Sequence, residues 1–347
     1  MTPVAEPSSP SVPVFQERCT TVVEPEEGVL HVTRSIPVPR SVSEHAQTVL
    51  SLTAMFPGPT AAPPADDRAA WVEHSADVDN TIAMALAPQI EGVEVQVELR
   101  TIDGVPVFEV TPADVDVDGD TPIFLDIHGG GLVYGSGEAC RVMAVLSVAR
   151  SGMWTWSPDY RMPPAHPYPA SLDDCMTVYR ALLVTKGPGQ IVVGGASAGG
   201  NLAAALLLRA QDEGLPMPSC LVLLSPEADL TESGDSFETN LGVDTILTSR
   251  LTDSIALYAG DHDLTEPLLS PLFGDLSGFP PTFLQTGTRD LFLSNTVRMH
   301  RALRSAGVGA ELHVFEAMPH GGFHGAPEDQ ELAREMWRFM AEHLDHG

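Results

Sequence analysis

Hydrophobic and polar residues follow two different patterns along this chain, and the change comes near residue 91. Upstream, apolar residues at helical spacing predict helices over 41–56 and 67–88, separated by a turn cluster rich in proline. Downstream, residues 93–100 and 105–110 alternate apolar and polar side chains on either side of a short Asp-Gly join. This alternation predicts two antiparallel strands with one face in water.

Beyond residue 120 the predicted strands are buried on both faces. Short continuous apolar runs occur at 122–129, 153–159, 190–196, 220–226, 282–287 and 311–316. Helical patterns separate most of them, at 137–151, 170–186, 198–213, 292–306 and 328–344. Such alternation is typical of an α/β fold, in which helices cover both faces of a mostly parallel sheet. The stretch from 229 to 280 is too long for one crossover, so we expect an insertion above the sheet.

The composition allows a sizeable core and disfavours nucleic acid as a partner. Of the 347 residues, 43% are hydrophobic, and the net charge of −29 would repel phosphate groups and anionic membranes. The start of the sequence shows no secretory signal pattern, and no apolar run approaches the ~18 residues of a membrane span. The cysteines are scattered without a Cys-x-x-Cys pair, which favours reduced thiols in a cytoplasmic protein; they are Cys19, Cys140, Cys175 and Cys220.

A single serine stands among small residues where a predicted strand meets a predicted helix. Residues 195–199 read Gly-Ala-Ser-Ala-Gly, which matches G-x-S-x-G. A tight strand-to-helix turn requires small neighbours and raises the hydroxyl of Ser197 over the sheet edge, beside the backbone N–H groups of a helix N-terminus. The motif alone is common and could be a glycine-rich turn, but the flanking strand and helix favour a nucleophile.

A second glycine-rich segment follows an earlier strand. His128, Gly129, Gly130 and Gly131 come directly after the apolar run 122–129. Consecutive glycines let bare backbone approach a ligand and direct N–H groups at a developing oxyanion. A merely flexible loop would explain neither the histidine nor the preceding strand.

A serine nucleophile needs an imidazole base oriented by a carboxylate, and both follow in the expected chain order. Asp290 comes just after one predicted strand, and His320 lies in the loop after the next. Asp290 could instead cap the helix near Leu293, and His324 could be the base or could join His320 in binding a metal. No further ligand cluster is evident, so we expect neither a metal nor a cofactor.

Six landmarks in order resemble the hormone-sensitive-lipase-like branch of the α/β-hydrolases, the bacterial esterases that carry His-Gly-Gly-Gly. They are the 128–131 loop, the segment 159–170, the serine elbow, and the segments 223–231, 287–290 and 318–323. The elbow departs from the family pattern at Ala196, where Asp or Thr is usual, so a polar contact beside the nucleophile is missing. The resemblance implies an eight-stranded sheet with a helical cap, and it selects His320 as the base.

The resemblance also implies roles for further residues. Backbone N–H groups of Gly129, Gly130 and Ala198 form the oxyanion hole. His128 and Gly131 support that loop, and Asp159 with Arg161 hold it through an ion pair or hydrogen bonds. Glu227 and Asp229, at another strand end, are structural or belong to the site. We expect the substrate pocket to be lined by Tyr134, Met55, Phe56, Leu251 and Ile255.

The same resemblance divides the chain into four parts. Residues 1–65 form an arm and cap helices, 66–230 and 277–347 form the core, and 231–276 form a cap insertion. The expected activity is hydrolysis of short- to medium-chain esters or lactones through an acyl-enzyme. An amidase, formamidase or carbamate hydrolase would use the same three residues, whereas a receptor on this fold would have lost the base. The segment 310–318 could pair two subunits into a homodimer.

Overall fold

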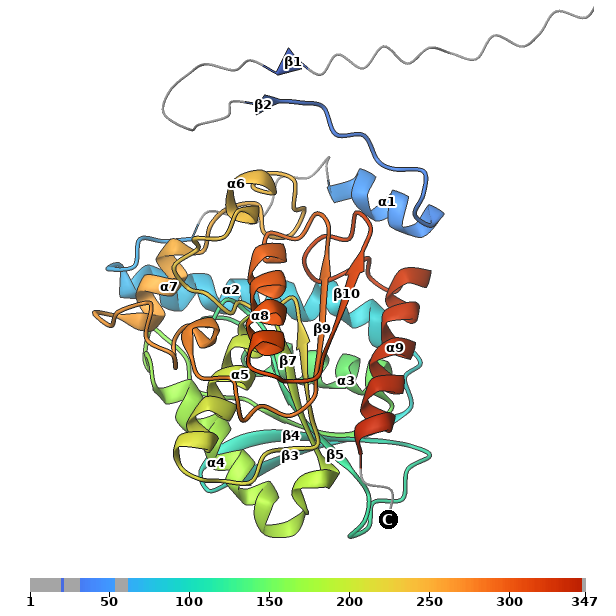
Figure 1. Ribbon diagram of the computed structural model, residues 1–347, viewed down its shortest axis with the longest axis vertical. Coiled ribbons are helices and arrows are strands. Elements are labelled where there is room, and N and C mark those ends of the chain that lie inside the picture. Colours follow the sequence, from blue (N-terminus) through green and yellow to red (C-terminus); the bar gives the residue numbers. More distant parts are fainter. Residues whose placement is uncertain (1–19, 22–31, 54–61, 345–347) are drawn as a thin grey trace, which may run out of the picture. The chain divides into compact units, whose positions relative to one another are not determined.

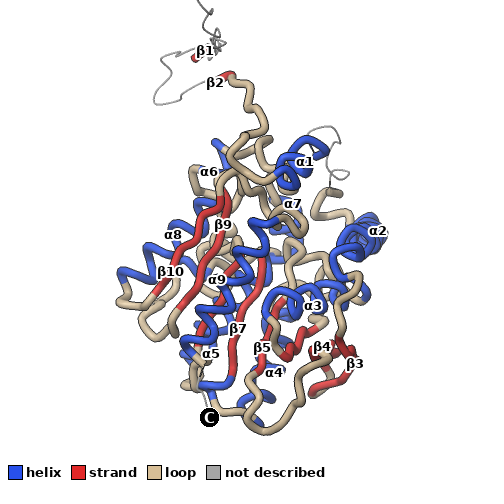
Figure 2. The backbone as a smooth tube through the Cα atoms, turned by 90° about the vertical axis from the view of Figure 1, so that its right-hand side faces the viewer, coloured by secondary structure: helices blue, strands red, loops and turns tan. Residues whose placement is uncertain are grey.

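The structure is a computed structural model that describes residues 20–21, 32–53 and 62–344. The chain divides into two compact units, residues 1–39 and residues 40–347. In the first unit, β1 (Thr20–Thr21) pairs antiparallel with β2 (Val32–Thr33). The second unit contains the α/β core drawn in Figures 1 and 2. In the described part of the chain, none of the helices combines the length and apolar character needed to cross a membrane.

Eight strands of the second unit form one sheet with the order β10-β9-β8-β7-β5-β6-β4-β3. Only β3 and β4 break the parallel arrangement: β3 pairs antiparallel with β4, and β4 pairs antiparallel with β6. The strands are β3 (Val95–Ile102), β4 (Val105–Pro112), β5 (Ile123–Ile127), β6 (Trp154–Pro158), β7 (Ile191–Ala196), β8 (Cys220–Leu224), β9 (Thr282–Gly287) and β10 (Ala310–Phe315). Each apolar run of the sequence is therefore a strand, and the mostly parallel sheet is confirmed.

The described helices follow the predicted helical patterns closely. They are α1 (Glu44–Thr53), α2 (Arg68–Leu86), α3 (Glu138–Ser151), α4 (Ala170–Thr185), α5 (Ala198–Asp212), α6 (Ser236–Thr239), α7 (Thr252–Ala259), α8 (Leu293–Ser305) and α9 (Pro327–His343), with 3₁₀ turns at Ala87–Ile90, Pro188–Gln190 and Pro271–Phe273. Local capping explains some of the boundaries. For example, the carboxylate of Asp67 accepts a hydrogen bond from the N–H of Ala70 at the start of α2.

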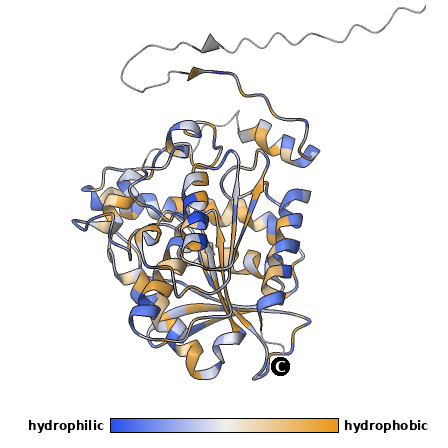
Figure 3. Ribbon diagram, in the orientation of Figure 1, coloured by the Kyte–Doolittle hydropathy of each residue, from blue (hydrophilic) through white to orange (hydrophobic). Residues whose placement is uncertain are grey.

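The core has a layer on each face of the sheet, because successive residues of a strand point to opposite faces. On β5, Ile123, Leu125 and Ile127 pack in a cluster with α4, α5 and α8, whereas Phe124 packs with α9 on the other face. Helix α3 covers β4 and β6 on that second face. Figure 3 shows the hydrophobic strands between helices whose outer faces are hydrophilic.

The insertion predicted at 231–276 contains α6, α7 and the turn Pro271–Phe273. Figure 1 shows α6 near the carboxyl ends of β9 and β10. The amide of Asn240, just after α6, donates hydrogen bonds to the backbone oxygens of Thr288 and Asp290 (3.3 and 2.8 Å). The insertion is thereby joined directly to the loop that follows β9.

Candidate active site

The serine of the elbow stands where β7 meets α5. Ser197 has φ 58° and ψ −124°, a strained conformation for a residue other than glycine, and it is 9% exposed. A Cβ at Gly199 would lie 1.8 Å from the carbonyl oxygen of Ile127, so only glycine lets α5 pack this closely on β5. The turn places Ser197 at the carboxyl edge of the sheet. The N–H of Ala198 beside it belongs to the first helical turn, whose donors have no partner within the helix.

The glycine loop after β5 lies directly against this serine. A Cβ at Gly129 would be 3.3 Å from the Cβ of Ser197. At Gly130, φ is +130° and a Cβ would lie 2.0 Å from the carbonyl oxygen of Tyr134. The N–H groups of Val133 and Tyr134 donate to the carbonyl oxygen of Gly130 (3.1 and 2.8 Å) and close the turn. The loop is therefore held in one conformation beside the nucleophile position.

Asp290 and His320 form a buried pair at the same edge. The Nδ1 of His320 lies 3.1 Å from Oδ1 of Asp290, which is fully buried. Oδ1 also accepts from the N–H of Phe292 (2.8 Å), and Oδ2 accepts from the hydroxyl of Thr286 (2.9 Å). Burial raises the pKa of Asp290, but its interactions with His320, together with hydrogen bonds from Ser225 and Phe292, outweigh burial and hold that pKa below its usual range. The carboxylate of Asp290 thus orients the imidazole of His320 and also stabilises the loop that precedes α8.

The imidazole of His320 is surrounded by acidic groups. Burial lowers the pKa of His320, but the charge and hydrogen bond of Asp290, followed by the charge of Asp244, outweigh burial and raise it. Asp244 comes from the insertion, and its Oδ2 accepts hydrogen bonds from the N–H groups of Leu291 (2.8 Å) and His320 (3.3 Å). Asp244 therefore fixes the backbone of the loops that present both members of the pair.

His128 lies beneath the glycine loop and is a neutral imidazole. Its Nδ1 is 2.8 Å from the carbonyl oxygen of Gly129, and its ring stacks on Tyr160 with centroids 4.1 Å apart. The hydroxyl of Tyr160 donates to the carbonyl oxygen of His128 (2.8 Å). Burial lowers the pKa of His128 to about 4, so the ring carries no charge near neutral pH. These contacts are those of a bracing residue.

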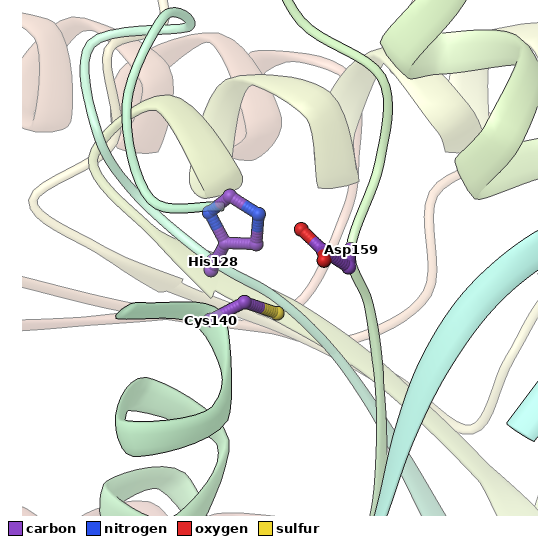
Figure 4. Close-up of side chains that lie close together, drawn as sticks. All are labelled: His128, Cys140 and Asp159. Carbon is purple, nitrogen blue, oxygen red and sulfur yellow. The ribbon is translucent and has the colours of Figure 1, made fainter. Parts of the chain in front are cut away.

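One group of side chains in the described residues has the composition of a metal site. His128, Cys140 and Asp159 point toward one another, and one ligand atom of each lies within 4.8 Å of the others (Figure 4). Both carboxylate oxygens of Asp159 accept from the N–H of Gly137 (3.1 Å each).

His324, the alternative base or ligand, has its Nδ1 3.2 Å from Nε2 of Gln89.

Comparison with known proteins identifies the family. Residues 124–324 match a family described as having the α/β hydrolase fold. The chain belongs to this family. An esterase of Acinetobacter venetianus is 36% identical to it over 206 residues, which cover 57% of this chain and 66% of that esterase. The chain thus spans just under two thirds of this relative's length.

Two solved structures extend the similarity over most of this hydrolase. Esterase E25 is 37% identical with a TM-score of 0.83, and the match covers 90% of this chain and 98% of E25. An esterase from the bacterial hormone-sensitive lipase family is 30% identical with a TM-score of 0.74, covering 87% and 99%. The fold class and the resemblance that the motifs predicted are confirmed.

Of the expectation that Asp159 and Arg161 hold the glycine loop through an ion pair or hydrogen bonds, only the part concerning Arg161 and a mutual ion pair is wrong. Asp159 accepts a hydrogen bond from the N–H of Gly137, which follows the glycine loop. Arg161 instead forms a bidentate ion pair with Asp174 of α4. The physical reason is that the two side chains bond segments attached to helices on opposite faces of the sheet. Gly137 precedes α3 on one face, and α4 packs on the other.

The predicted lining residues lie in several different environments. The hydroxyl of Tyr134 is 3.1 Å from Nε2 of His74 on α2, and burial raises the pKa of Tyr134 to about 12. The Cδ1 of Leu251 would be 3.8 Å from a Cβ at Gly131, so Leu251 borders the glycine loop. Ile255 is buried in the core cluster that includes α4 and α5. Met55 and Phe56 lie outside the described residues.

The departure at Ala196 leaves space beside the elbow. Two cavities, of about 160 and 50 Å³, are both bordered by Ala196. Asp126 and Arg150 line the larger cavity, and His320 lines the smaller. Burial raises the pKa of Asp126 to about 7. A larger polar side chain before the serine would project into this space.

Proposed function

We propose that this hydrolase cleaves short- to medium-chain carboxylic esters or lactones through an acyl-enzyme formed on Ser197. Carboxylic-ester hydrolysis is the activity that its esterase relatives support. The observation that carries the proposal for individual residues is the buried hydrogen bond between His320 and Asp290, at the sheet edge where the elbow and the glycine loop meet.

Each group has a chemical task in this reaction. His320, with Nδ1–H donated to Asp290, takes the hydroxyl proton of Ser197 through Nε2 as the oxygen attacks the ester carbonyl. The N–H groups of Gly129, Gly130 and Ala198 stabilise the oxyanion. His320 then protonates the leaving alcohol, and water repeats the sequence to release the acid. No step requires a cofactor.

Hydrolysis of p-nitrophenyl esters from acetyl to palmitoyl tests the proposal, with Ser197→Ala run in parallel. We expect turnover that is highest on short acyl chains, with loss of activity in the folded variant. A matched p-nitroanilide measures amide cleavage by the same residues. Absence of ester turnover by folded protein would contradict the proposal, and anilide turnover exceeding ester turnover would replace it with an amidase.

A further inference from the structure

Glu227 is a buried carboxyl group beside the nucleophile, and no hydrogen bond in the described structure satisfies it. The residue is 1% exposed, and both of its carboxylate oxygens are buried without a hydrogen-bond partner. In the described part of the chain, no other carboxyl group has both oxygens in this state. Buried polar groups are normally satisfied, so an unsatisfied one is commonly retained for a function.

The backbone fixes Glu227 next to the elbow. Its N–H donates to the carbonyl oxygen of Ser197 (3.0 Å), and its own carbonyl oxygen accepts from the amide of Asn201 (2.8 Å). Asn201 lies on α5, one turn after the nucleophile. The backbone of Glu227 is therefore held against the backbone of Ser197.

The surroundings of the carboxyl group place it between the base and the cap. Its electrostatic neighbours are His320, Glu232 and Tyr258 of α7. Oε1 of Glu232 accepts from the N–H of Leu251, the residue that borders the glycine loop at Gly131. The side chain of Glu227 thus lies among His320, the proposed base, and two residues of the insertion, Glu232 and Tyr258.

Burial, followed by the charge of Glu232, raises the pKa of Glu227 to about 8, despite the opposing effect of His320. Near neutral pH the group is therefore mostly a neutral acid, which can donate one hydrogen bond and accept others. A neutral acid held in this way can recognise an oxygen atom on a ligand without the cost of burying a charge.

We propose that Glu227 binds the substrate through a hydrogen bond, so that this hydrolase prefers esters carrying a hydroxyl group near the scissile bond over plain alkyl esters. The inference rests on the proposed esterase function and adds a substrate class to it. Binding would supply the partner that both carboxyl oxygens lack. A plain alkyl ester would leave the group unsatisfied.

The test compares kcat/KM for ethyl butyrate, ethyl 3-hydroxybutyrate and 2-hydroxyethyl butyrate. The first ester has no hydroxyl group, the second carries one on the acyl side, and the third carries one on the alcohol side. We expect a hydroxylated ester to be favoured, and Glu227→Leu to reduce that preference by ~10- to 100-fold, the usual effect of losing one buried hydrogen bond to substrate. Glu227→Gln, which keeps a donor and an acceptor, should retain most of the preference.

A matched control makes the same change elsewhere. Glu98 is exposed on β3 at the far edge of the sheet, so Glu98→Leu should leave the preference unchanged. A Glu227→Leu variant that folds and shows a preference within twofold of the parent would overturn the inference alone. Absence of turnover on all three esters and on p-nitrophenyl esters would overturn the proposed function, and the inference with it. A melting temperature raised in Glu227→Leu would add support, because removing an unsatisfied buried carboxyl stabilises the fold.

Discussion

Replacing Asp290 with asparagine tests how much the buried charge beside His320 contributes to catalysis. The substitution preserves the shape of the side chain. The retained oxygen can still accept from Nδ1 of His320 and from the N–H of Phe292, while the new amide donates to the hydroxyl of Thr286. The variant should therefore fold and lose chiefly the negative charge.

The geometry gives the magnitude of this loss. The Nδ1 to Oδ1 distance of 3.1 Å places the charge centres about 4 Å apart, for which an effective dielectric constant of about 20 gives about 4 kcal/mol. This interaction exists only when His320 carries a proton, as it does in the transition state. At about 1.4 kcal/mol for each factor of ten, kcat should fall by about 10³-fold.

The assay is kcat on a p-nitrophenyl ester at a pH above the titration of His320, with melting temperature as the check on folding. The pH dependence gives a second readout, because removing the carboxylate lowers the pKa of His320 and moves the acid limb to lower pH. A loss of less than tenfold in a folded variant, with an unchanged acid limb, would refute the charge argument and reopen the choice of acid.

The remaining predictions concern protonation, the glycine loop and assembly. In the parent protein, activity requires neutral His320. Because the pKa of His320 is raised, the acid limb of the kcat/KM profile should have its midpoint above about pH 6.5. A midpoint below about pH 6 would contradict this prediction. Gly130→Ala should abolish ester turnover, because its Cβ would meet the oxygen of Tyr134 at 2.0 Å, whereas Gly92→Ala, in open space at φ +78°, should retain it. Among the described strands β10 pairs with β9 alone, and Val314 on β10 is 46% exposed. We therefore expect a homodimer that pairs through this edge and is weakened by Val314→Lys. A monomer in sedimentation at micromolar concentration would refute pairing through this edge.

The pairing of Asp290 with His320 could be predicted because it depends on sheet topology. Parallel strands end on one edge, and β7, β9 and β10 each end immediately before a residue of the predicted triad or its loop. A strand is recognisable from a short apolar run, so the meeting of distant residues follows from a few local patterns. The glycine loop was predictable for the same reason, since it follows β5.

The partners of Arg161 could not be predicted in this way. At the end of a strand, the direction of each side chain depends on the local turn, which an apolar pattern does not determine. The sequence shows Asp159 two residues away and Asp174 thirteen away, and proximity in sequence favours the wrong partner. Only the placement of α3 and α4 on opposite faces separates them. Tyr160 was missed similarly, because one aromatic residue after a strand has no pattern that distinguishes stacking on His128 from ordinary core packing.

Asp244 shows why the insertion and the site cannot vary independently. Asp244 lies in an irregular segment of the insertion, where no periodicity predicts a contact, yet it bonds the backbone of both His320 and Leu291. The charge of Asp244 also raises the pKa of His320. A change in the insertion that displaced Asp244 would therefore shift the base's pKa and loosen its loop together. The insertion and the protonation of the base are therefore coupled through Asp244.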